Sequence, residues 1–388
     1  MVAPDERIRL MQRSGIREVM DLAAGRPDVL HLEVGQPDFA TPEHIVEAGV
    51  AAARDGYTTY TANKGLVEVR ESIAAKLARD NGIHAEADDV VVTAGAVNAL
   101  IETLTALVGP GDKVLIPDPG WPNYQMMADV LSVEAVRYPL LAEDDFLPDL
   151  DRLEALAADP RAKVLLINTP ANPTGAVFPE HVVHQLVELA ARHDLYLLSD
   201  ECYEQVVFEG RHVSPGAMDT DRVLSVFSLS KGYAMTGWRM GYVTGPREVV
   251  DLVAKVQEPM ISCCTAISQK AGQAALEGDQ TCVTEMRDAY RRRRDLVVEV
   301  LLDGGLLVTV PHGAFYIMAD VSRVTADSYA FARRLVADAG VAVAPGETFG
   351  PSGAGLVRLS LATSSEDLVE GARRLVGAVE QWSGRAPW

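Results

Sequence analysis

The hydrophobic pattern of the chain alternates short apolar runs with longer amphipathic stretches between Val90 and Gly245. Runs rich in Val, Ile and Leu, bounded by turn residues, predict buried strands at residues 90–93, 113–116, 163–167, 195–199 and 223–227, and residues 241–245 add another. Helical periodicity occupies residues 98–108, 122–131, 151–158 and 179–193 between them. This alternation predicts an α/β fold with a mostly parallel central sheet and helices on both faces.

The pattern changes after Pro246. Residues 281–302 predict a long charged connecting helix, and beyond Gly304 short strands (307–310, 314–318, 341–343 and 357–361) alternate with two helices (328–339 and 365–382). The first 45 residues look irregular. We expect a large domain over residues 46–282 and a small α+β domain made of residues 1–45 and 283–388. Because no repeat or Ser/Pro-rich linker separates them, the two are expected to pack together.

Composition narrows the classes of function. The formal net charge of −20 argues against a nucleic-acid partner, which would need a basic face. No apolar run approaches the ~20 residues that span a bilayer, and the N-terminus is unlike a signal peptide. The four cysteines have no metal-ligand spacing, and Cys263 and Cys264 are adjacent. We therefore expect a cytoplasmic protein with reduced thiols, no bound metal and no membrane contact.

The most informative segment surrounds Lys231. It lies just beyond the predicted strand 223–227, with Ser228 and Ser230 before it and Arg239 eight residues after it. A lysine in this setting suits covalent attachment to an aldehyde cofactor, with the serines and Arg239 holding a phosphate group. The alternative is a solvated Lys and Arg beside a Ser-rich turn.

Polar and aromatic residues follow four other predicted strands. Asp200 follows 195–199, and its carboxylate would pair with the ring nitrogen of a pyridine cofactor while Tyr203 and Asn172 bond the ring's phenolic oxygen. Gly95 and Ala96 open a helix whose N-terminus suits a phosphate. Trp121 is placed to stack on a flat ring. Each has an ordinary alternative: a helix N-cap Asp with a packed Tyr, a Pro-Gly turn, a plain strand-to-helix turn, and core packing.

The ligand crevice of an open α/β sheet lies at the carboxyl ends of its strands, where all these fragments fall. With these fragments taken together, the chain resembles the class I/II aminotransferases of the pyridoxal-phosphate fold-type I superfamily, in the branch of the aspartate, aromatic and alanine aminotransferases. The resemblance runs from the segment Val34–Phe39 to the segment Val357–Ser360. It depends on Asn-Pro-Thr-Gly at 172–175, Ser-x-Ser-Lys at 228–231 and Thr-Gly-Trp-Arg at 236–239.

The resemblance implies a seven-stranded central sheet, pyridoxal 5'-phosphate as cofactor and a role for each matching residue. Lys231 would bind the cofactor and transfer the proton, and Asp200 would hold the ring nitrogen. The phenolic oxygen would be held by Tyr203 and Asn172, and Trp121 would stack on the ring. Gly35, Asn172 and Arg358 would bind the substrate, and Arg358 would grip the substrate's α-carboxylate. The phosphate would be held by Gly95, Ala96, Ser228, Ser230 and Arg239, with Tyr60 donated by the other subunit of a homodimer.

The resemblance implies a ping-pong aminotransferase acting on an L-amino acid and a 2-oxo acid. The sequence departs from the family in two places. The family's Gly-x-x-Gln-Ala is here Gly95-Ala96-Val97-Asn98-Ala99, with Val97 where relatives that use aspartate have a lysine, and Cys263-Cys264 occupies a stretch to which no role is assigned. Because Val97 supplies no charge, we expect a neutral amino acid, aliphatic or aromatic; the alternative is that an arginine of the N-terminal segment or of the second subunit supplies the missing charge. The alternatives are a carbon–sulfur β-lyase or specialised biosynthetic enzyme of the same fold type, a transcription regulator, for which no basic winged-helix segment precedes the fold, and a non-catalytic relic.

Overall fold

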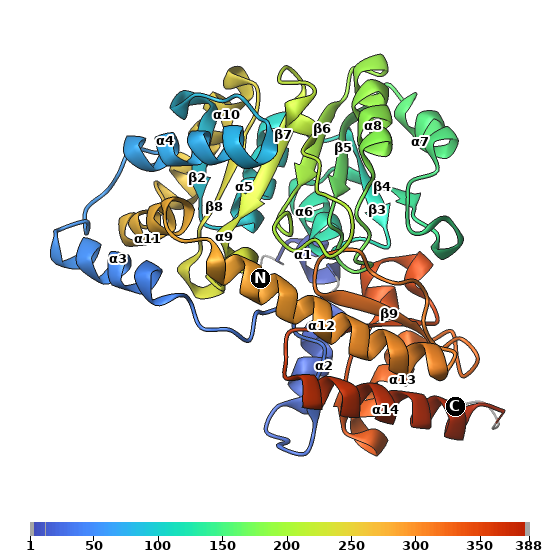
Figure 1. Ribbon diagram of the computed structural model, residues 1–388. Helices are drawn as coiled ribbons and strands as arrows, with labels where there is room; N and C mark the ends of the chain where they lie inside the picture. The colour runs from blue at the N-terminus through green and yellow to red at the C-terminus, as the bar shows by residue number, and fades with distance from the viewer. Residues whose placement is uncertain (1–3, 12, 385–388) are drawn as a thin grey trace.

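The computed structural model describes residues 4–11 and 13–384, and its main feature is the predicted seven-stranded sheet (Figure 1). The spatial order is β2-β8-β7-β6-β5-β3-β4. β8 runs antiparallel to β2 and β7, and the remaining pairs are parallel. The strands are β2 (Val90–Thr93), β3 (Lys113–Asp118), β4 (Glu134–Pro139), β5 (Ala162–Asn168), β6 (Tyr196–Asp200), β7 (Val223–Ser228) and β8 (Gly241–Thr244).

Helices cover both faces of this sheet because its central strands are apolar on both sides. Val164 and Leu166 of β5 face one layer, whereas Leu165 and Ile167 face the other, as the two-residue period of a strand requires. The first layer contains α5 (Ala96–Leu107), α6 (Asn123–Leu131) and α10 (Arg247–Ile261). The second contains α4 (Val67–Lys76), α7 (Leu150–Ala157), α8 (Glu180–Arg192) and α11 (Ala266–Glu277), and α3 (Glu43–Arg54) packs on α11.

The remainder of the chain forms a smaller layer beyond α12 (Thr281–Asp303), which crosses the molecule in Figure 1. Its antiparallel sheet has the order β11-β12-β9, and a separate pair joins β1 to β10 in parallel. The strands are β1 (Leu30–His31), β9 (Tyr316–Asp320), β10 (Val341–Ala342), β11 (Ala344–Pro345) and β12 (Leu356–Ser360). The helices are α13 (Ser328–Arg334) and α14 (Ser365–Trp382). Pairing of β1 with β10 brings the N-terminal segment into this layer.

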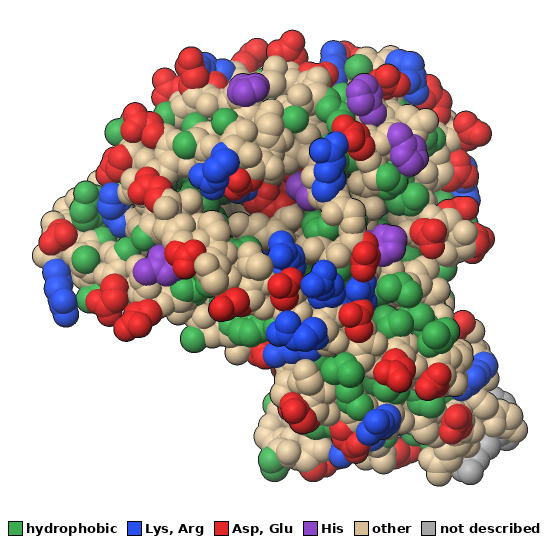
Figure 2. Space-filling model, viewed as in Figure 1, with side chains coloured by type: hydrophobic (Ala, Val, Ile, Leu, Met, Phe, Trp, Pro, Cys, Tyr) green, Lys and Arg blue, Asp and Glu red, His purple; other side chains and the backbone are tan. Residues whose placement is uncertain are grey.

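The N-terminal segment is more regular than predicted. It contains α1 (Glu6–Leu10) and α2 (Gly15–Ala23), and Val19 and Ala23 of α2 are buried in the smaller core. On α12, Arg293 binds both carboxylate oxygens of Asp38, at 2.8 and 2.7 Å. Figure 2 shows Lys and Arg side chains gathered where α12 crosses, among acidic groups spread over the rest of this face. The segment is therefore held by α12 as well as by β10.

Two predictions about strands were wrong. Residues 307–310 do not form a strand, since only Leu307 makes an isolated bridge, to Ala319. Strand β4 was missed because it is the edge strand, with Glu134 and Arg137 interrupting its apolar pattern. No helix in the described part of the chain has both the length and the apolar character needed to cross a membrane.

Candidate active site

A cavity of about 360 Å³ opens at the carboxyl ends of β5, β6 and β7. Most of the predicted site residues line it: Gly35, Ala96, Trp121, Asn172, Asp200, Tyr203, Ser228, Ser230, Lys231, Arg239 and Arg358. They come from segments far apart in the sequence, which the parallel sheet brings to one edge. Gly95 borders the cavity through Arg239, whereas Tyr60 is outside it.

Lys231 is positioned by the short helix α9 (Leu229–Gly232), which begins directly after β7. Its Nζ donates a hydrogen bond of 2.6 Å to the carbonyl oxygen of Gly35. Burial of the amine lowers the pKa of Lys231 to about 8, because the charged form is poorly solvated there. A substantial neutral fraction near physiological pH makes this amine a nucleophile and a base.

Asp200 ends β6 and is buried, with a side chain that accepts two hydrogen bonds. Tyr124 donates to Oδ2 at 2.7 Å, and the Cys202 amide donates to Oδ1 at 3.2 Å. Burial raises the pKa of Asp200 because the charged carboxylate is poorly solvated there, and the ion pairs of the described residues include none to this carboxylate. A protonated ring nitrogen in the cavity would supply the missing positive charge.

Asn172 and Tyr203, which both line the cavity, are each held by a hydrogen bond to another lining residue. The Tyr203 hydroxyl is 2.8 Å from that of Tyr316, and the Oδ1 of Asn172 accepts from Arg358 at 2.8 Å. Asn168 joins this region to Asp200: its Oδ1 accepts from the Asn172 amide and its Nδ2 donates to the Asp200 carbonyl, at 2.8 and 2.9 Å. The ends of β5 and β6 are thus fixed relative to each other.

Arg358 on β12 is a buried cation without an ion-pair partner among the described residues. Besides Asn172, it donates to the Glu33 carbonyl at 2.6 Å, and its guanidinium lies 4.1 Å from the centre of the Tyr316 ring. Its buried Nε has no hydrogen-bond partner in the described chain, and burial lowers the pKa of Arg358. A ligand carboxylate would satisfy both the orphaned N–H and the charge.

The turn between β2 and α5 forms a small cradle beside Arg239. Gly95 has φ of +79°, and a Cβ there would lie 2.6 Å from Nη2 of Arg239, so only glycine fits. Arg239 donates to the carbonyls of Thr236 and Ala94 at 3.0 and 3.2 Å, and within the described residues no carboxylate pairs with it. With the free amides at the N-terminus of α5, this cation suits a phosphate.

Ser228 faces the same region from the end of β7. Its Oγ accepts from the Ser230 amide at 3.1 Å and so caps α9, which carries Lys231. The serine therefore lies between the candidate phosphate cradle and the candidate nucleophile.

Several lining residues were missed by sequence reasoning. Tyr124 is the second residue of α6, three positions after Trp121, and Asn168 directly follows the predicted strand 163–167, so both positions carried a signal. Tyr316 gives no such signal because it belongs to the smaller layer. Ile16, Arg17 and Met20 of α2 also line the cavity. Their helical spacing is a signal for α2, although the segment was predicted to be irregular.

Tyr60 lies away from the cavity of its own chain, with 88% of its surface exposed. The next residue, Thr61, donates its amide hydrogen to Sγ of Cys263 at 3.4 Å. All four cysteines are free thiols. The exposure of Tyr60 leaves its ring available to a second molecule, and its predicted role across a subunit boundary stays a prediction.

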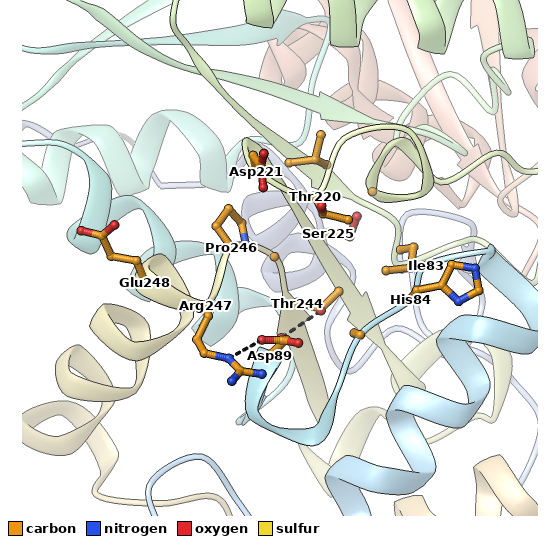
Figure 3. A pocket seen from close by; sticks show the side chains of 14 residues that line it. Ile83, His84, Asp89, Thr220, Asp221, Ser225, Thr244, Pro246, Arg247 and Glu248 are labelled. Atoms are coloured by element: carbon orange, nitrogen blue, oxygen red, sulfur yellow. Dashed lines mark hydrogen bonds and ion pairs between the residues drawn. The ribbon is translucent and has the colours of Figure 1, made fainter.

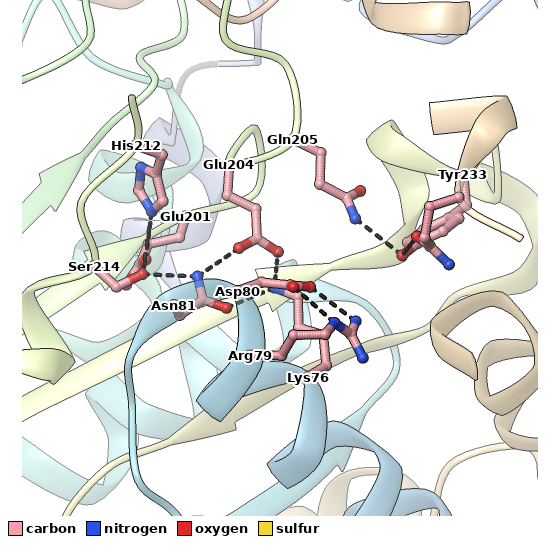
Figure 4. Close-up of polar contacts among 11 residues, drawn as sticks. Lys76, Arg79, Asp80, Asn81, Glu201, Glu204, Gln205, His212, Ser214 and Tyr233 are labelled. Carbon is pink, nitrogen blue, oxygen red and sulfur yellow. Dashed lines mark hydrogen bonds and ion pairs between the residues drawn. The ribbon is translucent and has the colours of Figure 1, made fainter. Parts of the chain in front are cut away.

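A polar network surrounds Glu201, the residue that follows Asp200 in the sequence (Figure 4). Glu201, the next residue, accepts from His212 and Ser214 at 2.6 and 2.5 Å, and Ser214 is bound in turn by Asn81 at 2.8 Å. Asn81 also binds Glu204, which pairs with the buried Lys76. Through these contacts Glu201 anchors the chain directly after β6, next to Asp200, whose side chain lines the cavity.

A second cavity, of about 490 Å³, lies at the opposite edge of the sheet (Figure 3). Its arginine, Arg247, is neutralised by Asp89 and Glu86 at 2.7 and 2.9 Å. Among its lining residues there is no lysine. This cavity therefore lacks both the free cations and the nucleophile of the first.

A buried lysine, a buried carboxylate, a tryptophan and a glycine turn beside an arginine, gathered at one cavity of this fold, are the features of a pyridoxal-phosphate enzyme. The donor set fits the cofactor: Asp200 suits the ring nitrogen, the Arg239 cradle suits the phosphate, and Lys231 suits the aldehyde. The family model described as aminotransferase class I and II matches residues 27–375. The chain belongs to this family and is a pyridoxal-phosphate-dependent aminotransferase with amino acid and 2-oxo acid substrates, as predicted.

Named relatives and solved structures agree with this assignment. The chain is 41% identical to an aspartate/prephenate aminotransferase of Thermus thermophilus, over 92% of each chain. It is 38% identical to an arginine–pyruvate transaminase of Pseudomonas aeruginosa, again over 92% of each. The structure of Thermus thermophilus aspartate aminotransferase with maleate superimposes with a TM-score of 0.93 at 39% identity, covering 97% of this chain and all of the other. The predicted fold type is confirmed.

Proposed function

We propose that this aminotransferase uses neutral L-amino acids, aliphatic or aromatic, as amino donors, in a two-step ping-pong exchange with a 2-oxo acid. The carrying observation is the apolar lining of the cavity away from the cofactor residues: Ile16, Met20, Val34 and Val97. Burial of an apolar substrate side chain against them is favourable by about 25 cal/mol per Å². Asp200 is the sole carboxylate among the described lining residues, so a basic side chain has no free partner.

The proposed roles follow from the contacts of each residue. Arg358 binds the α-carboxylate of the substrate through its fork of N–H groups, and Asn172 fixes the plane of that fork. When bound, pyridoxal phosphate supplies an aldehyde that takes up the amino group and a ring that accepts electrons from Cα. Lys231 would first hold the cofactor. Its freed Nζ would then take the proton from the substrate Cα and deliver it, on the same face, to the carbon that was the cofactor's aldehyde carbon.

The other residues hold the cofactor in the orientation that this proton transfer needs. Asp200 stabilises the positive charge at the ring nitrogen, and Tyr203 and Asn172 bind the phenolic oxygen. Trp121 stacks on the ring, and Gly35 lies along the substrate. The phosphate is held by Gly95, Ala96, Ser228, Ser230 and Arg239. Each of these assignments is supported by the position of the residue at the cavity, or beside it in the case of Gly95.

We further propose a homodimer in which Tyr60 of each subunit binds the phosphate in the other subunit's site. The high exposure of this tyrosine supports the proposal, as does its neighbourhood. Met260 and Ile261 are also exposed, and they lie next to Cys263, which the Tyr60 segment contacts. A two-fold interface would bury this surface on both subunits. We also propose a cytoplasmic location and a division into two domains at residues 45/46 and 282/283. Residues 1–3, 12 and 385–388 of the small domain lie outside the described chain.

A second candidate, a dicarboxylic donor, is favoured by one observation. Arg17 of α2 lines the cavity and is exposed, and its side chain has no ion pair or hydrogen bond among the described residues. It is placed to receive a side-chain carboxylate, and the names of several relatives, aspartate aminotransferases among them, agree with such a donor. A screen of amino donors against pyruvate and 2-oxoglutarate separates the two. The neutral proposal expects leucine, alanine or phenylalanine to exceed aspartate, and an aspartate preference above tenfold contradicts it.

A further inference from the structure

The side chain of Asn98, the third residue of α5, makes one hydrogen bond to the loop before the helix and another to a residue further along the helix. Its Oδ1 accepts a hydrogen bond of 2.9 Å from the amide of Ala94, four residues earlier. Its Nδ2 donates a hydrogen bond of 2.8 Å to Oε1 of Glu102, four residues later. Asn98 thus joins the residue before the glycine turn to a carboxyl group inside the helix layer.

Glu102 determines which end of the Asn98 amide faces Ala94. The Glu102 side chain is fully buried, its Oε2 has no partner within the described chain, and burial raises its pKa to about 7. Whether protonated or ionised, this group retains an oxygen that accepts from the amide NH₂. Because the NH₂ group must face Glu102, the amide oxygen faces the N–H of Ala94.

Ala94, whose N–H is bound by Asn98, also contacts Arg239 through its carbonyl. The Ala94 carbonyl accepts from Nη2 of Arg239 at 3.2 Å, so one residue, through the two peptide groups on either side of its Cα, links the Asn98 amide to the cation. On the other side of the turn, Thr93 Oγ1 donates to the Gly95 carbonyl at 3.1 Å. Gly95 itself lies close to Arg239, since a Cβ at this position would be 2.6 Å from Nη2.

We propose that Asn98, oriented by Glu102, is a positioning residue for the cofactor phosphate: it fixes the Ala94 peptide, and through it Arg239 and the first amides of α5. This inference rests on the proposed assignment of the phosphate to the turn at Gly95 and Arg239. It gives a purpose to a position at which the sequence departs from the Gln of the family pattern, and to a buried carboxyl group that the reaction does not use.

The test compares two ligands that differ only in the phosphate. Apoprotein carrying Asn98→Ala is titrated with pyridoxal phosphate and with pyridoxal, and binding is followed by tryptophan fluorescence and by absorbance. A positioning role predicts that Kd for pyridoxal phosphate rises at least tenfold, whereas Kd for pyridoxal changes less than twofold. An equal rise for both ligands, as a general loss of structure would give, overturns the proposal, and so does no rise for either.

Variants of Glu102 provide an independent arm, which also decides the matter if Asn98→Ala does not fold. The measured quantity is the Kd for pyridoxal divided by the Kd for pyridoxal phosphate. Glu102→Gln keeps an acceptor oxygen and is expected to retain the wild-type value of this ratio. Glu102→Leu removes the acceptor and is expected to lower the ratio, as Asn98→Ala does. Equal ratios for the Gln and Leu variants contradict the proposed orienting role.

Two further variants distinguish an error in this inference from an error in the assignment of the phosphate. Arg239→Ala must lower the preference for the phosphorylated ligand; if it does not, the phosphate is bound elsewhere and both ideas fall. If Arg239→Ala lowers the preference and Asn98→Ala does not, the inference about Asn98 alone is wrong. Gln125→Ala removes a similar amide–carboxylate pair, with Asp129 on α6, and is expected to leave both constants unchanged.

Discussion

The hydroxyl of Tyr124 donates a hydrogen bond of 2.7 Å to Oδ2 of Asp200, and both side chains are buried. This bond fixes the carboxylate at the end of β6 and stabilises its charged form, although burial acts in the opposite direction on its pKa. The pair therefore helps to keep a negative charge at the end of β6, where the proposed assignment places the ring nitrogen of the cofactor.

Tyr124→Phe is expected to lower kcat about tenfold, which corresponds to about 1.4 kcal/mol of transition-state stabilisation. The ring and its packing remain, and the hydrogen bond to a charged group is lost. Steady-state kinetics measure the change. Tyr138→Phe is the matched control, because its buried hydroxyl donates to the Leu166 carbonyl at 2.8 Å instead. The same loss of kcat in both variants would assign the effect to packing.

Asp200→Asn is expected to lower kcat by several orders of magnitude. The amide has the same shape but lacks the charge that opposes the ring nitrogen, and that charge is most needed when electrons from Cα enter the ring. Single-turnover absorbance measurements with a good amino donor give the rate. A loss of less than about tenfold, or 1.4 kcal/mol, would mean that another group sustains the ring.

Lys231→Ala is expected to abolish turnover and covalent cofactor attachment. The wild-type apoprotein should also show a characteristic pH profile, since its lysine has a pKa of about 8 in place of 10.5. The rate of covalent capture of pyridoxal phosphate is expected to rise about tenfold per unit of pH below 8 and to level off above it, because only the neutral amine attacks. A rate that continues to rise toward pH 10.5 would contradict the shift.

The lowered pKa of Lys231 also has a consequence for apoprotein stability. Between pH 8 and 10.5 the unfolded chain retains a proton on this amine that the folded chain has lost. The free energy of unfolding contributed by Lys231 therefore rises with pH in this window. Chemical denaturation of the wild-type apoprotein and of Lys231→Met across this range measures the difference between their slopes. Identical slopes would contradict the shift.

The sequence predicted the central sheet and most of the site for a physical reason. Parallel strands are buried on both faces, so their apolar runs are visible, and the polar residues that follow them must gather at one edge. Asp200, Asn172 and Lys231 were found in this way. Contacts between layers that are distant in the sequence could not be predicted. Nothing near Tyr316 indicates that it lies beside Tyr203, and nothing near Glu33 indicates that its carbonyl accepts from Arg358.

The proposed role of Tyr60 predicts complementation between two defective subunits. Lys231→Ala is inactive, and Tyr60→Leu is expected to weaken cofactor binding at least tenfold. In a mixed dimer, one site combines Lys231 of one chain with Tyr60 of the other and is intact. An equimolar, fully exchanged mixture should therefore recover about a quarter of wild-type activity at limiting cofactor, since half of the dimers contain one intact site. If Tyr60 serves its own chain, or if the protein is an active monomer by light scattering, no recovery is expected.

The choice between neutral and dicarboxylic donors can be tested by adding a single positive charge to the cavity. Val97 is 38% exposed in the isolated chain and lines the cavity at the start of α5. Val97→Lys is expected to raise kcat/KM for aspartate at least tenfold, because a side-chain carboxylate then has a cation to replace its lost hydration. The same change should lower kcat/KM for leucine by removing apolar contact.

Arg17→Met distinguishes the second candidate in the same assay. If neutral donors are preferred, loss of this exposed cation should change kcat/KM for leucine and aspartate by less than about threefold each, as expected for a charge that stays in solvent. If Arg17 receives a substrate carboxylate, aspartate alone loses at least tenfold while leucine does not. Because specificity between similar apolar side chains is limited to about 1–3 kcal/mol, the wild-type enzyme should accept several neutral donors within about 200-fold of one another. A donor profile restricted to aspartate, abolished by Arg17→Met, would overturn the neutral assignment.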